Sequence, residues 1–440
     1  MCSMNRPRCS IAATALAGGL LIAPALQAAP VDARGRPMAD RATPAETPQG
    51  REFRAGVQAQ LKGDLASARS RFEAALKLDS NYTPALIGLA GVAQARGDVQ
   101  QTEQFLQQAE RVSPKSADVH LAWGRHYMRS GQLERAEKSL TTARDLAPKA
   151  IPPLLELGEI YIRAPGRSAD AMRAYRSAIE LDGANKFAQY GLGIAAAAAG
   201  QRDEALKALD KAAALAPKDP APLRAIGRMH LEAASMDNAL AAFDTGLARQ
   251  PRFLPLMLDR TDALAGMGRW NDALAQLSDA KKMAPKSAEV QLKLADVYQG
   301  AQRWKDAEAA YLKSIALEPR NPLAYNNLAW ITVSRNGDAN KAVGWASKAV
   351  ELSPNSSPLH DTLGWAKRAA GDLPGAQSSL QRALEIEPNV AGYHFHLGLV
   401  QRDLKRLAEA RASLQRALEI DAKLPQADEA RRVIKELGPQ

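Results

Sequence analysis

Residues 360–388 read HDTLGWAKRAAGDLPGAQSSLQRALEIEP and contain the pattern that recurs through the chain. The stretch ends in Pro388, and prolines recur upstream at intervals of 34 residues, with one interval of 35 and one of 69. The long interval equals two repeats, and Gly183 stands where the missing proline would fall. The series consists of Pro114, Pro148, Pro217, Pro251, Pro285, Pro319, Pro354 and Pro388. Such a period predicts a stacked array of small units rather than one large core.

We number the positions within each repeat from the first repeat, in which Gln49 is position 1. Position 8 is then glycine or alanine except at Thr261, position 20 is alanine except at Thr102, and position 27 is always small. Larger apolar side chains, such as Leu397 at position 7 and Phe243 at position 24, lie beside them. Because small side chains let helix axes approach closely, this pattern predicts two packed helices in each repeat. Eleven repeats fit between residues 49 and 424.

This 34-residue pattern, with small residues at positions 8, 20 and 27 and proline at position 32, resembles the tetratricopeptide repeat (TPR) family. The resemblance implies an all-α fold, a right-handed superhelical solenoid of about eleven helix-turn-helix repeats plus a C-terminal cap helix. The expected organisation is a signal peptide in residues 1–28, a flexible linker in 29–48, the solenoid in 49–424, and the cap helix and tail in 425–440.

The N-terminal residues predict export from the cell. Arg6 and Arg8 precede an uncharged, mostly apolar run at 11–23, and Ala28 offers a small residue at a cleavage position. These three features are typical of a secretory signal peptide; the alternative is an anchor that is not removed. No later apolar stretch has the ~20 residues that span a bilayer. We therefore expect a periplasmic or secreted protein without a transmembrane segment after cleavage.

Composition and charge exclude several classes of function. Only 5% of the 440 residues are aromatic, and the two cysteines, Cys2 and Cys9, fall in the expected signal peptide. A disulfide framework and a multi-cysteine metal site are therefore excluded. The formal net charge of +10 is spread along the chain without a basic stripe. We therefore expect no nucleic-acid partner.

The histidines do not form a catalytic pattern. Three of the six, His120, His360 and His394, share position 4 of their repeats, where a packing role is expected. The sequence brings together no nucleophile, base and orienting group, and it has no glycine-rich phosphate loop. We expect no enzyme activity, no cofactor and no metal site.

The concave face of the solenoid is the expected partner-binding surface. In this family it is formed mainly by positions 2, 5, 9 and 12 of the first helices. Position 9 is tryptophan in two neighbouring repeats, and exposed tryptophan suits peptide anchoring or sugar stacking. The expected partner-binding residues are Trp330, Trp365, Asn326, Asn327, Asp361 and Phe395. The alternative is that the two tryptophan rings pack between adjacent first helices.

Three segments support a narrower resemblance. YNNLAW at 325–330, HDTLGW at 360–365 and GYHFHLGLV at 392–400 resemble the C-terminal repeats of exported bacterial TPR proteins of exosortase/PEP-CTERM and exopolysaccharide-export systems. This resemblance implies a scaffold that holds protein partners of a cell-envelope assembly. Two alternatives remain open: a module that binds polysaccharide directly, and a pilus or outer-membrane assembly factor.

Overall fold

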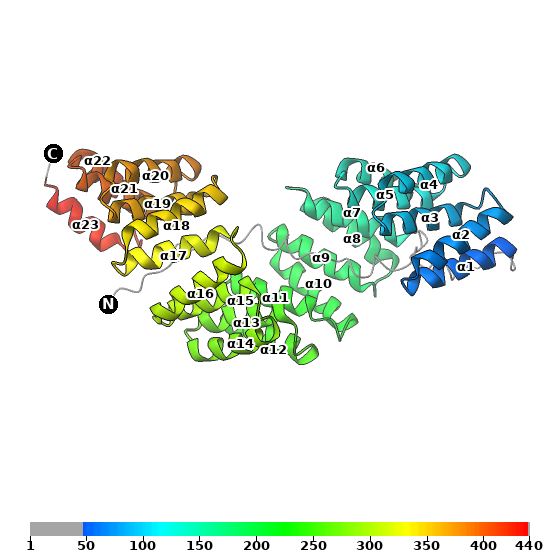
Figure 1. Cartoon of the computed structure of the whole chain (residues 1–440), viewed down its shortest axis with the longest axis horizontal. Helices are drawn as coiled ribbons and strands as arrows, with labels where there is room; N and C mark the ends of the chain where they lie inside the picture. Colours follow the sequence, from blue (N-terminus) through cyan, green and yellow to red (C-terminus); the bar gives the residue numbers. More distant parts are fainter. Residues whose placement is uncertain (1–46, 439–440) are drawn as a thin grey trace. The chain divides into compact units, whose positions relative to one another are not determined.

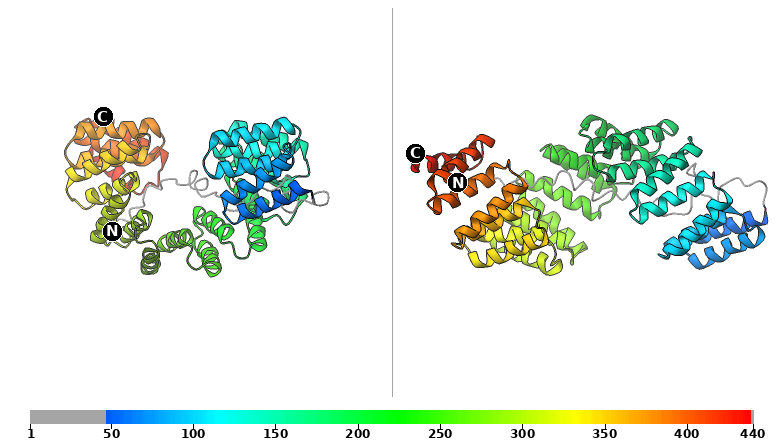
Figure 2. Two further views of the ribbon diagram at one scale, coloured as in Figure 1. Left: turned by 45° about the vertical axis from the view of Figure 1, so that its right-hand side comes forward. Right: turned by 90° about the horizontal axis from the view of Figure 1, so that it is seen from above.

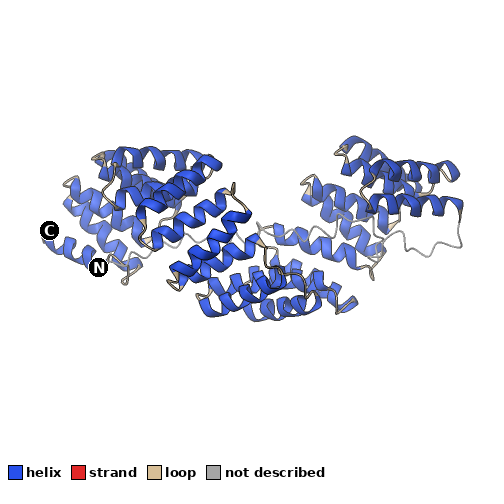
Figure 3. Cartoon of the chain, turned by 60° about the horizontal axis from the view of Figure 1, so that its bottom comes forward, coloured by secondary structure: helices blue, strands red, loops and turns tan. Residues whose placement is uncertain are grey.

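The computed structural model describes residues 47–438, and within that range it contains helices joined by short turns and no strand (Figure 3). The predicted signal peptide, 1–28, lies outside the described residues, as does the predicted linker apart from Thr47 and Pro48. Pro48 begins α1, one residue before the predicted start of the solenoid, and the Thr47 hydroxyl accepts a hydrogen bond of 3.3 Å from the Gly50 amide.

Each repeat contributes two helices. The first helices are α1 (Pro48–Leu61), α3 (Thr83–Ala95), α5 (Ala117–Arg129), α7 (Ile151–Arg163), α9 (Lys186–Ala198), α11 (Ala221–Glu232), α13 (Leu254–Gly266), α15 (Ala288–Gly300), α17 (Pro322–Ser334), α19 (Ser357–Ala369) and α21 (Ala391–Asp403). The second helices are α2 (Leu65–Leu78), α4 (Val99–Val112), α6 (Leu133–Leu146), α8 (Ser168–Leu181), α10 (Arg202–Leu215), α12 (Met236–Arg249), α14 (Trp270–Met283), α16 (Trp304–Leu317), α18 (Ala339–Leu352), α20 (Leu373–Ile386) and α22 (Leu407–Ile420). A last helix, α23 (Ala427–Glu436), packs on α22. The predicted all-α stack of helix pairs is confirmed.

The described chain forms two compact units, residues 47–232 with α1–α11 and residues 233–438 with α12–α23. We call them the N-terminal and the C-terminal unit. Within each unit, helices that follow one another in the chain lie side by side (Figures 1 and 2). Between residues 47 and 438, no helix combines the length and the apolar character needed to cross a membrane.

Glycine at position 8 sets how closely the two helices of a repeat approach. A Cβ atom added at Gly158 on α7 would lie 2.6 Å from the Tyr175 ring on α8, and one added at Gly398 on α21 would lie 2.7 Å from Leu414 on α22. Tyr175 also fills the gap to the next repeat, because a Cβ added at Gly191 on α9 would lie 2.3 Å from its ring. Cores packed this densely leave no room for an added methyl group, so packing requires the small residues that define the pattern.

The turn between the two helices of a repeat requires a left-handed backbone at position 15. Glycine supplies it in six repeats, and Gly166 supplies it in the longer turn of the fourth repeat. In the other four repeats, a residue with a Cβ atom adopts the conformation: Ala234, Gln302, Asn336 and Lys405, with φ from 52° to 63°. The following amide donates to a carbonyl five residues back, as from Arg406 to Gln401 at 2.9 Å. This is the usual closure of a helix C-terminus, and it overrides the local cost of the left-handed region.

Position 4 connects the first helix of a repeat to the turn that precedes it. His120, His360 and His394 each place Nε2 2.8–2.9 Å from the carbonyl oxygen of the proline six residues earlier. Gln189 donates in the same way, at 3.3 Å, to the carbonyl of Gly183, the residue that replaces proline in its repeat. These bonds satisfy a turn carbonyl and hold the start of the first helix against the turn.

Replacing Lys405 by glycine should raise the free energy of unfolding of the C-terminal unit by about 1 kcal/mol. The left-handed conformation costs an L-residue about that much, and it costs glycine almost nothing. Urea unfolding followed by circular dichroism measures the effect. The opposite change one repeat earlier, Gly371→Ala, should lower the free energy by a similar amount. A neutral or destabilising Lys405→Gly would show that the turn does not strain the lysine.

Replacing Gly398 by alanine should lower the free energy of unfolding of the C-terminal unit by about 1–3 kcal/mol, because the added methyl group overpacks the contact with Leu414. The matched control is Gly344→Ala on α18, where an added Cβ has no atom within 4 Å. Alanine there should stabilise by about 0.5–1 kcal/mol through helix propensity alone. Effects of the same sign at the two positions, in urea unfolding, would contradict the packing role.

Candidate interaction surface

Side chains at positions 6 and 9 of consecutive first helices meet in a row. A side chain at position 9 contacts the position-6 side chain of the next first helix, 31 residues later. In the C-terminal unit, Asp262 on α13 pairs with Lys293 on α15 at 2.5 Å, and Asp296 on α15 accepts a hydrogen bond from Asn327 on α17 at 3.2 Å. We call positions 6 and 9 of α13 to α21 the first-helix row. It contains both tryptophans of the predicted site, Trp330 and Trp365.

The side chain of Trp365 on α19 is half-buried, and its ring packs against two neighbours. It stacks on the imidazole of His396 on α21, with ring centroids 4.5 Å apart and ring planes inclined by 29°. The guanidinium of Arg368 lies 4.6 Å from the centroid of the same ring and is held by Asp403 at 2.7 Å. Trp365 also packs on the apolar cluster that joins Phe395 to α23. The structure thus places this tryptophan between adjacent first helices.

Two other predicted partner-binding residues are buried: Asp361 is 4% exposed and Phe395 is 2% exposed. Asp361 Oδ1 lies 2.7 Å from Nδ1 of His396, so this pair joins α19 to α21 and orients the imidazole that stacks on Trp365. Phe395 belongs to the apolar cluster beneath. Both residues are buried beside the row, where they support His396 and the apolar cluster, and they offer almost no surface to a partner.

Trp330 on α17 has a more distant ring neighbour than Trp365, although both side chains are half-buried. The ring centroid of Trp330 lies 6.3 Å from that of His396, with the planes inclined by 43°. Asn326 and Asn327 lie about one turn before it, and Asn326 Nδ2 donates to Asn327 Oδ1 at 3.3 Å. Trp330 and the two asparagines are therefore half-buried, whereas Asp361 and Phe395 are buried.

A polar network fixes the side of the row next to Trp330. The hydroxyl of Tyr311 on α16 lies 2.7 Å from Asp296 Oδ1 and 2.7 Å from Gln299 Oε1, both on α15. Asp296 stands at position 9, which was predicted to lie on the concave face, whereas Lys293 and His396 stand at position 6, which was not. The 31-residue spacing between positions 9 and 6 is the signal that would have identified them.

The N-terminal unit uses the same geometry for buried ion pairs. Arg125 on α5 donates from Nε to Glu156 Oε1 on α7 at 2.7 Å, again 31 residues apart, and Glu156 is 1% exposed. Burial raises the pKa of Glu156, and the nearby Arg125 opposes that shift. Glu159, one turn later, is buried too and pairs with Arg163; burial raises its pKa as well.

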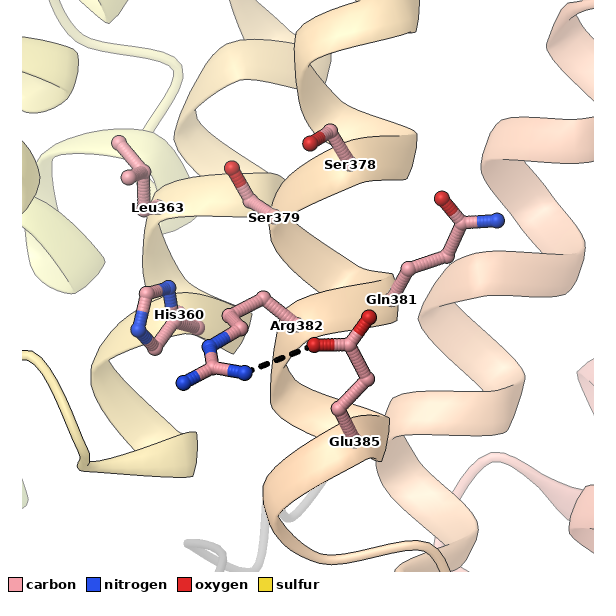
Figure 4. A pocket seen from close by; sticks show the side chains of 7 residues that line it. All are labelled: His360, Leu363, Ser378, Ser379, Gln381, Arg382 and Glu385. Atoms are coloured by element: carbon pink, nitrogen blue, oxygen red, sulfur yellow. Dashed lines mark hydrogen bonds and ion pairs between the residues drawn. The ribbon is translucent and has the colours of Figure 1, made fainter.

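An open hollow lies between α19 and α20, outside the first-helix row (Figure 4). Its lining residues are His360, Leu363, Ser378, Ser379, Gln381, Arg382 and Glu385. His360 is engaged by the Pro354 carbonyl, and Arg382 pairs with Glu385 at 2.8 Å. The imidazole of His360 and the charged groups of Arg382 and Glu385 therefore already have partners within the chain. Within residues 47–438, no three histidine, cysteine or acidic side chains converge as they would to hold a metal ion.

Family models agree with the helical repeats. One tetratricopeptide repeat model matches residues 190–252, 292–357 and 362–425, and a second matches residues 59–123 and 93–157. Together with the stack of helix pairs, these matches show that the chain belongs to the tetratricopeptide repeat family. Proteins of this fold typically act as scaffolds for protein–protein interaction rather than as catalysts.

Two curated proteins are similar to parts of the chain. "Cellulose synthase 1 operon protein C" of Komagataeibacter xylinus is 24% identical over 228 residues, which are 49% of this chain and 17% of that protein. "Protein NPGR2" of Arabidopsis thaliana is 30% identical over 144 residues, which are 30% of this chain and 20% of that protein. The chain thus matches a fifth or less of the length of either relative.

A solved structure shows the same fold. Yeast Tom70 superposes with a TM-score of 0.50 and 14% identity, covering 88% of this chain and 95% of Tom70. The Cut9-Hcn1 hetero-tetramer of the APC/C gives a TM-score of 0.49 and 15% identity, covering 90% of this chain and 97% of that one. The likeness to Tom70, at this identity, concerns the fold alone.

Replacing Glu156 by glutamine should flatten the pH dependence of stability of the N-terminal unit. Because the pKa of Glu156 is raised, the folded chain holds this proton more tightly than the unfolded chain does. The free energy of unfolding is then greatest below the ordinary glutamate pKa of about 4.3, and it falls as the pH rises through the raised pKa. Glutamine has no proton to lose, so the variant should show a smaller fall.

Urea unfolding of the N-terminal unit between pH 4 and 7 measures this effect. The control is Glu73→Gln on α2, which removes a carboxylate that is 46% exposed and paired with Arg69; it should keep the profile of the unmodified protein. Parallel profiles for Glu156→Gln and the unmodified protein would mean that the buried carboxyl is not the source of the pH dependence.

Proposed function

We propose that this chain is an exported scaffold that holds protein partners of a bacterial cell-envelope assembly, linked to exopolysaccharide export or to exosortase-dependent sorting. Membership in the TPR family supports the scaffold role. The N-terminal sequence supports the export, through Arg6, Arg8, the apolar run at 11–23 and Ala28.

The similarity to "Cellulose synthase 1 operon protein C" is the observation that carries the exopolysaccharide part of the proposal. It extends over 49% of this chain, so it reflects several consecutive repeats rather than one motif. Because it covers only 17% of the relative, the proposal takes from it the kind of assembly and no activity.

The partner surface in this proposal is the first-helix row of the C-terminal unit. Half-buried tryptophan flanked by amide groups is typical of the energetic centres of protein interfaces. Trp330 is half-buried, so a partner can still cover part of its ring, and His396 lies beside both Trp330 and Trp365.

Capture of partners tests this assignment. The tagged full chain is cross-linked in the bacterium that produces it, purified, and analysed by mass spectrometry. The unmodified protein should recover envelope proteins of polysaccharide assembly or surface-protein sorting, and Trp330→Ala/Trp365→Ala should recover them at least tenfold less. The matched control is Trp304→Ala, a half-buried tryptophan of the same unit outside the row, which should keep them. Full recovery by the double variant would remove the row from the proposal.

The same preparations report on export. We expect the chain in the periplasmic fraction, with its N-terminus at Ala29 after removal of residues 1–28. A chain that keeps its N-terminal residues and stays in the cytoplasm would overturn the envelope part of the proposal and leave the scaffold part intact.

A further inference from the structure

One ring nitrogen in the first-helix row has no partner. His396 on α21 is only 8% exposed, and its Nδ1 lies 2.7 Å from Asp361 Oδ1 on α19. Among residues 47–438, no group forms a hydrogen bond with the other ring nitrogen, Nε2. Nε2 is not one of the unpartnered polar atoms that the fold seals from solvent. The exposed part of this buried ring therefore includes Nε2.

The contact with Asp361 determines what Nε2 can bind. An ionised carboxylate can only accept hydrogen bonds, so the proton between the two side chains belongs to Nδ1 of His396. In a neutral imidazole, a proton on one nitrogen leaves the other nitrogen as an acceptor. Nε2 is therefore an acceptor held in a fixed direction, and its ligand must offer an N–H or O–H donor.

Two half-buried tryptophan rings lie beside this acceptor. The ring of Trp365 stacks on the imidazole of His396 with centroids 4.5 Å apart, and the ring of Trp330 lies 6.3 Å from it. Part of each indole side chain remains exposed. Aromatic rings pair favourably in offset or tilted contact at centroid distances of about 4.5–7 Å. A donor attached to a flat ring would therefore use the acceptor and the indole surface together.

The charged side chains bonded around the cluster balance one another. Arg368 and Arg402 both pair with Asp403, and Arg368 also lies over the ring of Trp365. With Asp361, these groups carry two positive and two negative formal charges. The cluster therefore gives a charged ligand no electrostatic advantage, and a neutral donor suits it.

We propose that Nε2 of His396, beside Trp330 and Trp365, accepts a hydrogen bond from the phenol hydroxyl of a tyrosine in a protein partner. The proposal rests on the scaffold function and specifies the side chain that the partner presents. Tyrosine carries a flat ring and one neutral donor in a single side chain, and it is enriched at the energetic centres of interfaces. A sugar hydroxyl is also a neutral donor; membership in a family of protein scaffolds favours tyrosine.

Three capped tripeptides test the proposal with the full chain. Acetyl-Gly-Tyr-Gly-amide presents the phenol, its phenylalanine counterpart lacks the hydroxyl, and its O-methyltyrosine counterpart keeps the oxygen but cannot donate. Ligand-observed NMR titration measures the dissociation constants. The tyrosine peptide should bind about fivefold more tightly than either counterpart, as expected for one net hydrogen bond.

Two variants separate the hydrogen bond from the ring contact. His396→Phe keeps a ring against Trp365 but removes the acceptor, so the tyrosine peptide should bind no better than the phenylalanine peptide. Trp330→Leu should weaken all three peptides about threefold and preserve the advantage of tyrosine. Partial unfolding of a variant would weaken all peptides alike and leave their ratio unchanged. The matched control is His394→Phe on the same helix, whose Nε2 already lies 2.9 Å from the Pro388 carbonyl oxygen; it should change neither affinity nor ratio.

The unmodified chain with isotope-labelled histidine gives a second measurement, which does not depend on the folding of a variant during binding. The tyrosine peptide should shift the Nε2 resonance of His396, because accepting a hydrogen bond changes the environment of that nitrogen. The phenylalanine and O-methyltyrosine peptides should leave the Nε2 resonance close to its position in the free chain.

Two results would overturn the inference. One is a tyrosine peptide that binds no better than its O-methyltyrosine counterpart, or whose advantage survives His396→Phe, since the hydroxyl would then not meet Nε2. The other is cellohexaose that binds through His396 while the tyrosine peptide shows no advantage, which would assign the acceptor to a sugar hydroxyl. In either case, envelope partners that are still lost from the double tryptophan variant would leave the proposed function standing.

Discussion

In six repeats, the contact between a glycine at position 8 and a large side chain at position 24 fixes the distance between the two helices. At Gly158 and Gly398 a single added Cβ atom would overlap the partner side chain. Because each second helix also packs on the next first helix, as Tyr175 does against Gly191, the same constraint passes from one repeat to the next. A chain with few aromatic residues can therefore build a long stack from many small contacts.

Regular spacing of the helices makes the surface regular too. Where successive first helices stand in the same register, position 9 of one meets position 6 of the next, as at Arg125–Glu156 and Asp296–Asn327. This one geometry holds an ion pair at Asp262–Lys293 and a stacked pair of rings at Trp365–His396. The packing positions keep small or apolar residues, whereas positions 6 and 9 vary, so they carry the differences on which recognition can depend.

The 34-residue period and the small residues at positions 8, 20 and 27 predicted the helix pairs, because close packing of the two helices places the same requirement on these positions in each repeat. The sequence did not predict the left-handed turn at Gln302 or Lys405, since nothing local in these residues favours it and the closure of the turn imposes it. It also could not separate Trp330 from Trp365. Both occupy position 9 and both are half-buried, but their ring contacts differ, because His396 stacks on Trp365 at 4.5 Å and lies 6.3 Å from Trp330.

The same positions bury an ion pair in the N-terminal unit and leave one partly exposed in the C-terminal unit. In the N-terminal unit, Glu156 is 1% exposed and forms an ion pair with Arg125. In the C-terminal unit, the side chains of Asp262 and Lys293 remain 40% and 26% exposed. A buried charge pair has already lost its water and has little left to offer a partner, whereas a partly exposed one can still exchange water for a new contact. For this reason we place the proposed partner surface on the first-helix row of the C-terminal unit rather than on α5–α7.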